Sequence, residues 1–194
     1  MNGSANQNKI NTDKIVYNFF DWADTIVHVI LLLCVMIVFI FRLADIDGRS
    51  MMNTLYDGDK VLTAKLFYSP KPKDIVVISQ GRYLNKPIVK RIIAVEGQAV
   101  DIDFNTGDVK VDGKVIDEPY IRNLTTNKQN GEIPITVPKG YVFVMGDNRQ
   151  ESSDSRCREI GLIDRHDIVG KVKWRLWSKS NIGLLDFSKF GRIS

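Results

Sequence analysis

Cysteine and histidine are scarce in this chain of 194 residues, which contains two of each. Cys34 lies inside a long apolar run and Cys157 lies far outside it, so we expect no disulfide between them. No group of cysteines and histidines has the spacing of a zinc site, so we also expect no metal and no other cofactor. Because His28 falls in the same apolar run, His166 is the only histidine available to a soluble domain.

Acidic residues are nearly absent from the C-terminal part of the chain. The whole chain carries a formal net charge of +4, but in the lysine- and arginine-rich residues 171–194 the sole acid is Asp186. The same segment contains the aromatic residues Trp174, Trp177, Phe187 and Phe190. This combination fits an anionic membrane surface, and a solvated basic strand end is the alternative. No nucleic-acid-binding fingerprint accompanies it, so we expect no nucleic-acid partner.

A long apolar run, TIVHVILLLCVMIVFIF, occupies residues 25–41. As a helix rising about 1.5 Å per residue it would span roughly 26 Å, which suffices for the hydrocarbon core of a bilayer. A cleaved signal sequence is the alternative, but Arg42 and Ala44 stand where cleavage would need two small residues. We therefore expect an uncleaved, single-pass anchor over residues 25–42, preceded by a short cytoplasmic segment, residues 1–24.

Flanking charge does not fix the orientation of this anchor, because cations lie on both sides of it. Long C-terminal domains translocate largely regardless of such charges, so an extracytoplasmic domain is permitted. Ser50 follows Arg42 by eight residues, which reach at most about 28 Å even when fully extended. Ser50 must therefore lie close to the bilayer surface.

The rest of the chain is rich in short, β-branched and often alternating segments separated by turn residues. This pattern predicts a mainly β domain over residues 43–180. Within it, residues 97–135 form a more polar, inserted hairpin region, and DVKVDGKVI predicts a hairpin that turns at Asp112-Gly113. Residues 181–194 form a basic C-terminal tail that could lie on the membrane surface.

Ser50 would need a base to act as a nucleophile. His166 lies in a polar turn before a strand, so a surface position is expected for it. In PIVKRIIAV, strand alternation places Lys90 and Arg91 on opposite, otherwise apolar faces. Arginine stays charged whereas lysine can lose its proton on burial, so Lys90 is the better base. A capping serine and a snorkelling strand-edge lysine remain the structural alternatives.

A third polar cluster, GDNRQESSDSR, spans residues 146–156. Its Asp, Asn and Ser side chains can hold a tight turn, and its acids and arginines can form charge-assisted pairs. Such a segment could serve only as a stabilised loop, or it could orient a buried lysine through a hydroxyl.

These three segments, in this order behind an anchor, resemble bacterial type I signal peptidases from about Asp24 to about Arg175. SMMNTL is similar to the serine box of that family, usually Ser-Met-x-Pro-Thr-Leu, and VKRIIAVEGQ is similar to its lysine box. GDNRQESSDSR matches the third box almost letter for letter and is the most specific of the three signals.

The resemblance implies a β-rich extracytoplasmic Ser/Lys endopeptidase at the cell membrane. It would remove signal peptides from secreted preproteins after small residues, at Ala-x-Ala sites. Ser50 would be the nucleophile and Lys90 the general base. Supporting roles would fall to Ser152, which would hydrogen-bond the lysine amine, to an Asp154–Arg156 pair, and to Asp147, which would stabilise the same loop. The apolar substrate pockets would be lined by Ile46, Met51, Leu55 and Ile88.

The family also implies that the Ser50 N–H faces the developing oxyanion. Some members add a hydroxyl two residues before the nucleophile, where this chain has Gly48. Asn53 replaces the usual proline of the serine box, which leaves that loop less rigidly preset. Glu96 and Gln98 stand where Pro and Asp are usual, and Cys157 follows the last box without a partner.

Two other functions would fit parts of this pattern. A self-cleaving Ser/Lys regulator has a related catalytic domain, but this sequence contains an anchor and no helical DNA-binding domain. A non-catalytic membrane scaffold or assembly chaperone would not require an intact Ser50 and Lys90. An anionic-lipid contact through the basic C-terminus is compatible with catalysis. For the oligomeric state, we expect a monomer.

Overall fold

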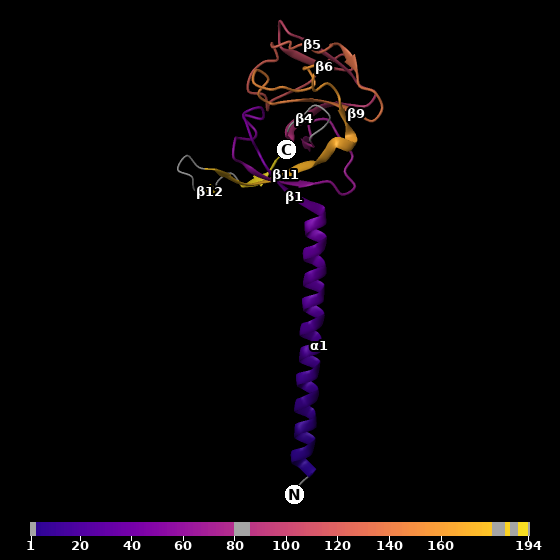
Figure 1. The fold of residues 1–194 in the computed structure, drawn as a ribbon, viewed down its shortest axis with the longest axis vertical. Coiled ribbons are helices and arrows are strands. Elements are labelled where there is room, and N and C mark those ends of the chain that lie inside the picture. The colour runs from indigo at the N-terminus through magenta and orange to yellow at the C-terminus, as the bar shows by residue number, and fades with distance from the viewer. Residues whose placement is uncertain (1–2, 80–85, 180–184, 187–189, 194) are drawn as a thin grey trace. The chain divides into compact units, whose positions relative to one another are not determined.

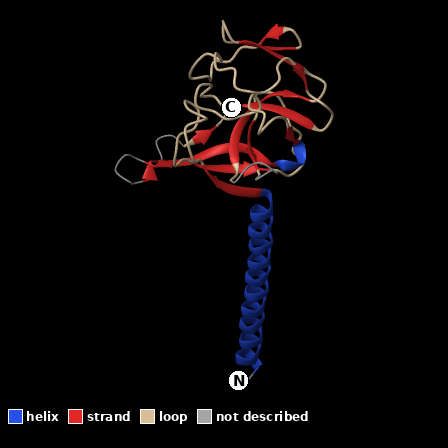
Figure 2. Cartoon of the chain, turned by 45° about the horizontal axis from the view of Figure 1, so that its top comes forward, coloured by secondary structure: helices blue, strands red, loops and turns tan. Residues whose placement is uncertain are grey.

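The computed structural model describes residues 3–79, 86–179, 185–186 and 190–193. The chain divides into two units, Met1–Ile40 and Phe41–Ser194, which are described separately. Figure 2 shows that the first unit is helical and that the second consists of strands and loops with one short 3-10 helix, η1 (Arg165–Asp167). The prediction of a mainly β domain behind one N-terminal helix is confirmed.

The first unit is a single helix, α1 (Gly3–Ile40). Its stretch Phe20–Val38 has a mean hydropathy of 2.0, long and apolar enough to cross a membrane. The helix begins well before the expected anchor, so much of segment 1–24 is helical. It also ends earlier than the expected residue 42, because the backbone from Phe41 onward pairs with a second strand.

The larger sheet of the second unit is antiparallel throughout, with the order β1-β2-β11-β3-β4-β9-β10. These strands are β1 (Phe41–Asp45), β2 (Lys60–Ala64), β3 (Ile75–Ile78), β4 (Ile88–Val95), β9 (Tyr141–Met145), β10 (Ile163–Asp164) and β11 (Ile168–Lys179). Figure 1 shows β4 and β9 between the end of the unit that holds β1 and β11 and the end that holds β5 and β6.

A smaller sheet, in the order β7-β6-β5-β8, comes between β4 and β9 in the sequence. Its strands are β5 (Ala99–Asp103), β6 (Asp108–Val111), β7 (Lys114–Val115) and β8 (Ile135–Thr136), so they follow the expected inserted region 97–135 closely. The hairpin predicted at Asp112-Gly113 forms between β6 and β7. Both turn residues have positive φ, 52° and 76°, as a tight two-residue hairpin turn requires.

Strand β4 carries apolar residues into more than one part of the core. Its alternation is interrupted by a register shift between Ile92 and Ala94 against β9. Such a bulge sets two residues of one strand against one of the other. As a result Ala94 packs with Ile93 against the smaller sheet, whereas Ile92 packs with β3 and β9.

The basic segment that begins at residue 171 is not a free tail. Residues 171–179 belong to β11, a central strand between β2 and β3, and the Lys171 amine pairs with Asp74. Two short strands, β12 (Leu185–Asp186) and β13 (Gly191–Arg192), pair back onto β11. Of the other tail positions, Phe190 is 63% exposed and Ile193 packs against the cluster of Met51 and Leu55. The remaining ones, including Phe187 and Lys189, lie outside the described residues, and the membrane-surface prediction stays a prediction.

Candidate active site

Ser50 lies in the turn between β1 and β2, and this turn packs against the hydrophobic core. Met51 and Leu55 are buried in a cluster with β2 and β3 residues, with exposed fractions of 1% and 0%. Gly48, whose φ is +100°, donates its N–H to the Asp57 carboxylate at 2.8 Å. Met51 and Leu55 therefore anchor this turn in the core, while Ser50 stays half-buried.

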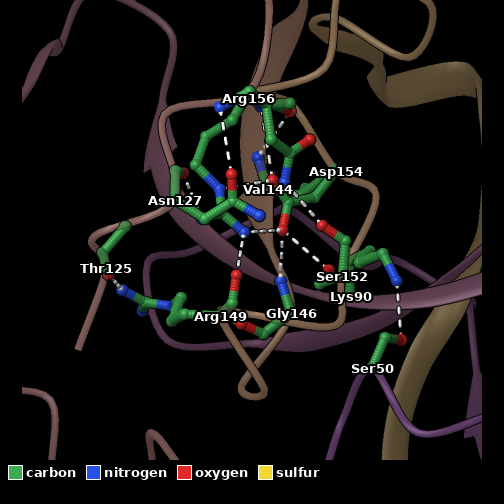
Figure 3. Close-up of polar contacts among 12 residues, drawn as sticks. Ser50, Lys90, Thr125, Asn127, Val144, Gly146, Arg149, Ser152, Asp154 and Arg156 are labelled. Atoms are coloured by element: carbon green, nitrogen blue, oxygen red, sulfur yellow. Dashed lines mark hydrogen bonds and ion pairs between the residues drawn. The ribbon is translucent and has the colours of Figure 1, made fainter. Parts of the chain in front are cut away.

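Lys90 reaches Ser50 from strand β4. Its side chain is 4% exposed, and its Nζ lies 2.7 Å from Ser50 Oγ, as Figure 3 shows. Among the described residues no carboxylate lies within ion-pair distance of this amine. Burial lowers the pKa of Lys90 to about 8, against an opposing effect of the Asp154 charge. An appreciable fraction of the amine is therefore neutral near physiological pH and can accept a proton.

Arg91, the next residue, faces the other way and is fully paired. It donates to both oxygens of Asp147 at 2.8 Å and to the Lys73 carbonyl at 2.8 Å, and it lies 3.9 Å from the centre of the Tyr120 ring. Asp147 also accepts the Thr54 hydroxyl. The Asp147 carboxylate thus ties its loop to β4 and to the turn after Ser50, and its role in stabilising that loop stays a prediction.

The expected Asp154–Arg156 pair forms at the centre of loop 146–156, with two N–O distances of 2.9 Å. Both side chains are completely buried. Asp154 also accepts the Gly146 N–H at 3.0 Å, and Figure 3 shows these contacts converging on its carboxylate. Burial by itself raises the pKa of Asp154. The hydrogen bond and the charge of Arg156 outweigh this effect and bring the pKa below its ordinary value. Asp154 therefore stays ionised.

Ser152 differs from the expectation. Its hydroxyl donates to Asp154 at 2.7 Å, and no hydrogen bond joins it to Lys90 within the part of the chain that the structure describes. A carboxylate is a strong acceptor for a hydroxyl, which accounts for the bond from Ser152 to Asp154. Ser152 nevertheless lies beside the backbone of Ser50. A Cβ on Gly146 would lie 2.3 Å from Ser152 Oγ and 2.5 Å from the Ser50 carbonyl oxygen, so only glycine permits this approach.

The four residues expected to line the substrate pockets do not lie together. Ile46, Met51 and Leu55 share one core cluster and are almost completely buried, so they form the floor of the Ser50 turn as the structure stands. Ile88 packs against a different cluster, on the side of Ile92 and Val144. Period-two alternation could not reveal this separation, because the clusters depend on which strands become neighbours.

Sequence reasoning missed three contacts of loop 146–156. Asn148 donates its N–H to the Ser50 carbonyl at 2.9 Å and its Nδ2 to the Arg49 carbonyl at 3.2 Å. Arg149 forms a buried pair with Glu118 from the region after β7. Asn148 and Arg149 both lie in the third motif, but neither carries a sequence signal that identifies its distant partner.

Three of the departures from the family pattern make local hydrogen bonds. The Glu96 carboxylate accepts the Gly140 N–H at 2.8 Å, and Gln98 Oε1 accepts the Val95 N–H at 3.1 Å. The Cys157 thiol donates to Glu159 at 2.6 Å. His166 is exposed in η1, as expected for a surface turn. No cluster of His, Cys, Asp and Glu that could hold a metal occurs in the described ranges.

Comparison with known proteins places this chain in a family. The family model for signal peptidase, peptidase S26, matches residues 19–177. A signal peptidase I of Bacillus licheniformis is 34% identical over 166 residues, which cover 79% of this chain and 86% of the relative. Signal peptidase I T of Bacillus subtilis is 35% identical over 188 residues, 90% of this chain and 94% of the relative. A crystal structure of a signal peptidase I from Enterococcus faecalis covers 54% of this chain and 97% of its own at 24% identity, with a TM-score of 0.46.

Proposed function

This chain belongs to the signal peptidase family, peptidase S26, and we propose that Ser50 and Lys90 are its catalytic dyad. The protein is a membrane-anchored serine endopeptidase that removes N-terminal signal peptides from secreted preproteins. The observation that supports the dyad is the distance of 2.7 Å between Lys90 Nζ and Ser50 Oγ. The Lys90 amine is buried and has no carboxylate partner among the described residues. The alternative of a non-catalytic scaffold is not favoured, since it would not require this arrangement.

The proposed reaction has two steps. Neutral Lys90 accepts the Ser50 proton while Oγ attacks the carbonyl carbon before the cleavage site. The tetrahedral intermediate collapses when the peptide C–N bond breaks, and the amine of the mature protein leaves with the proton that Lys90 held. An ester then joins the signal peptide to Ser50. Lys90 takes a proton from water as the water attacks this ester, and it returns a proton to Ser50 Oγ as the signal peptide leaves.

The remaining residues of the site act at a distance from the reacting atoms. Asp154 and Arg156 fix loop 146–156 and, through Ser152 and Gly146, the surface against which the Ser50 turn packs. We propose that small residues before the cleavage site are selected beside the Ser50 turn, above the floor that Met51 and Leu55 form.

We further propose a single-pass topology with residues 1–24 in the cytoplasm and the β-rich catalytic domain, residues 43–180, outside. Strand β1 follows the helix directly, so the first strand emerges next to the membrane. On that strand Leu43 is 63% exposed, and Trp174 of β11 is partly exposed and contacts Phe41. Exposed apolar side chains beside basic residues fit an anionic lipid surface. A monomer and the lack of a nucleic-acid partner stay predictions.

The test is cleavage of a preprotein with an Ala-x-Ala site by the full chain in detergent, compared with Ser50→Ala and Lys90→Ala. Lys110→Ala, on strand β6 of the smaller sheet, is the matched control. The proposal predicts cleavage by the wild type and the control, and loss of cleavage in both dyad variants. Cleavage that persists in Ser50→Ala would reject the dyad, and a folded wild type that cleaves nothing would favour the scaffold.

A further inference from the structure

Both peptide groups that flank Ser50 are held by one residue, Asn148. Its backbone N–H donates to the Ser50 carbonyl at 2.9 Å, and its side-chain Nδ2 donates to the Arg49 carbonyl at 3.2 Å. Asn148 is 1% exposed and lies 99 residues from Arg49 in the sequence. A single buried residue thus joins loop 146–156 to the turn that carries the proposed nucleophile.

The Arg49–Ser50 peptide is important because its N–H belongs to Ser50. In a trans peptide the C=O and the N–H lie in one plane and point in opposite directions. A hydrogen bond at the Arg49 carbonyl therefore also sets the direction of the Ser50 N–H. Neighbouring amides of the turn have acceptors: Met52 donates its N–H to the same Arg49 carbonyl at 3.2 Å, and Gly48 donates its N–H to Asp57. Asn148 Nδ2 adds a donor to that carbonyl from outside the turn. Within the described residues the Ser50 N–H has no acceptor, so it is available to a substrate oxygen.

The direction of this N–H should matter more here than in a site with several donors. Gly48 has no side chain that could stabilise an oxyanion, and its own N–H is bound to Asp57. Stabilisation of a developing oxyanion depends on donors that are fixed before the reaction, because a donor that must reorient costs free energy at the moment of reaction.

We propose that Asn148 is a positioning residue for the oxyanion donor: it directs the Ser50 N–H at the oxygen that becomes negative when Ser50 attacks. This inference rests on the proposed role of Ser50 as the nucleophile. Asn148 acts through the Arg49–Ser50 peptide and does not contact the substrate. Its other side-chain contact, from Nδ2 to Glu151 at 3.4 Å, is longer and does not involve the nucleophile.

The kinetic test compares Asn148→Ala and Asn148→Asp with the wild type in detergent. Aspartate keeps the shape of asparagine but cannot donate from its side chain. Gln150→Ala is the matched control, because Gln150 lies in the same loop and bonds Leu124 and Thr126 instead of the Ser50 turn. We expect kcat to fall on the order of 10²-fold in both Asn148 variants, with KM within a few-fold of the wild type. The pH dependence of Asn148→Ala should stay that of the wild type, because Lys90 is unchanged.

A peptide aldehyde that ends in Ala-x-Ala tests the donor directly. Ser50 Oγ adds to its carbonyl, the C=O π bond opens, and the hydroxyl proton passes to Lys90, which places an oxygen at the oxyanion position. The matching peptide alcohol cannot form this adduct. The wild type and Gln150→Ala should therefore bind the aldehyde more tightly than the alcohol. In the Asn148 variants this ratio should fall at least about tenfold, as expected when an oxyanion donor is misaligned, with the alcohol affinity unchanged.

Three results would overturn the inference: kcat values equal to that of Gln150→Ala, an unchanged aldehyde-to-alcohol ratio despite lost activity, or a displaced pH profile in Asn148→Ala. The second would assign Asn148 a role in folding alone, and the third would assign it an effect on Lys90. Failure of the proposed dyad would look different. The wild type itself would not cleave, or Ser50→Ala would bind the aldehyde as tightly as the wild type.

Discussion

Lys90 and Arg91 are neighbouring cations on strand β4, and both are buried, yet the two faces of the strand provide opposite surroundings. On one face, Arg91 has a bidentate carboxylate, a backbone carbonyl and an aromatic ring. On the other face, Lys90 has a serine hydroxyl at 2.7 Å, and its pKa falls to about 8.

The comparison separates two uses of a buried positive charge. A guanidinium surrounded by acceptors stays charged, and it links its own strand, β4, to the segments that contain those acceptors, which here include loop 146–156 and the turn after Ser50. An amine without such acceptors gains by losing its proton, which makes it a base. Burial alone is therefore not the signal for catalysis; burial without a counter-charge is.

The largest effect should come from making the two positions alike through Lys90→Arg. A guanidinium keeps its proton, so Ser50 would have no base, and kcat/KM should fall by on the order of 10³-fold or more. Cleavage of a preprotein by the detergent-solubilised variant measures this, with Lys114→Arg on the exposed hairpin as the control. Activity within tenfold of the wild type would show that proton transfer by Lys90 is not required.

Removing the counter-charge on the other face should affect stability next. Asp147→Asn leaves Arg91 buried without a carboxylate and should lower the free energy of unfolding by about 3–5 kcal/mol. Urea unfolding followed by tryptophan fluorescence measures the loss, and Asp117→Asn, at an exposed position, is the matched control. Equal stabilities of the two variants would contradict a structural role for the Arg91–Asp147 pair.

Lys90→Met should stabilise the protein while it abolishes activity. The folded-state pKa, about 8, lies below the ordinary value of 10.5, so the unfolded state binds more protons between these pH values and wild-type stability rises there with pH. Below pH 8 the wild type bears the whole cost of the buried charge, about 3 kcal/mol for this shift. The variant should therefore be more stable by about that amount at pH 6, with an advantage that shrinks toward pH 10.5. Unfolding measured at pH 6 and pH 9 tests this, and a constant difference would argue against a depressed pKa.

The smallest expected effect is the change in kcat/KM for each unit of pH. Because the proposed mechanism uses the neutral Lys90 amine, kcat/KM should rise about tenfold per pH unit below pH 8 and level off above it. The Asp154 charge raises the pKa of Lys90, so Asp154→Asn should move the midpoint to lower pH. Initial rates between pH 5 and pH 10 measure both curves. A flat wild-type profile, or a midpoint that moves upward in the variant, would contradict the assignment of Lys90 as the base.

The local sequence was sufficient to predict the secondary-structure elements and to identify the candidate site residues. Apolar runs, β-branched alternation and the Asp112-Gly113 turn predicted the helix, the strands and a hairpin that the structure contains. Alternation also predicted that Lys90 and Arg91 face opposite ways. Alternation could not predict that Asp147 would pair with Arg91 or that Ser152 would donate to Asp154. It also could not predict that Ile88 would be separated from Met51. These contacts depend on which strands become neighbours.

By itself the sequence determined that this protein has an apolar anchor and a β-rich domain, and that Ser50, Lys90 and loop 146–156 carry the family pattern. These properties reside in residue type and short-range periodicity, which do not require knowledge of the fold. Only the tertiary structure decided which buried cation is left without a counter-charge and which amide holds the Ser50 turn. Both outcomes depend on pairs such as Lys90–Ser50 and Asn148–Arg49, which are 40 and 99 residues apart. Strand register brings such residues together, and the desolvation that lowers the pKa of Lys90 exists only once they are enclosed.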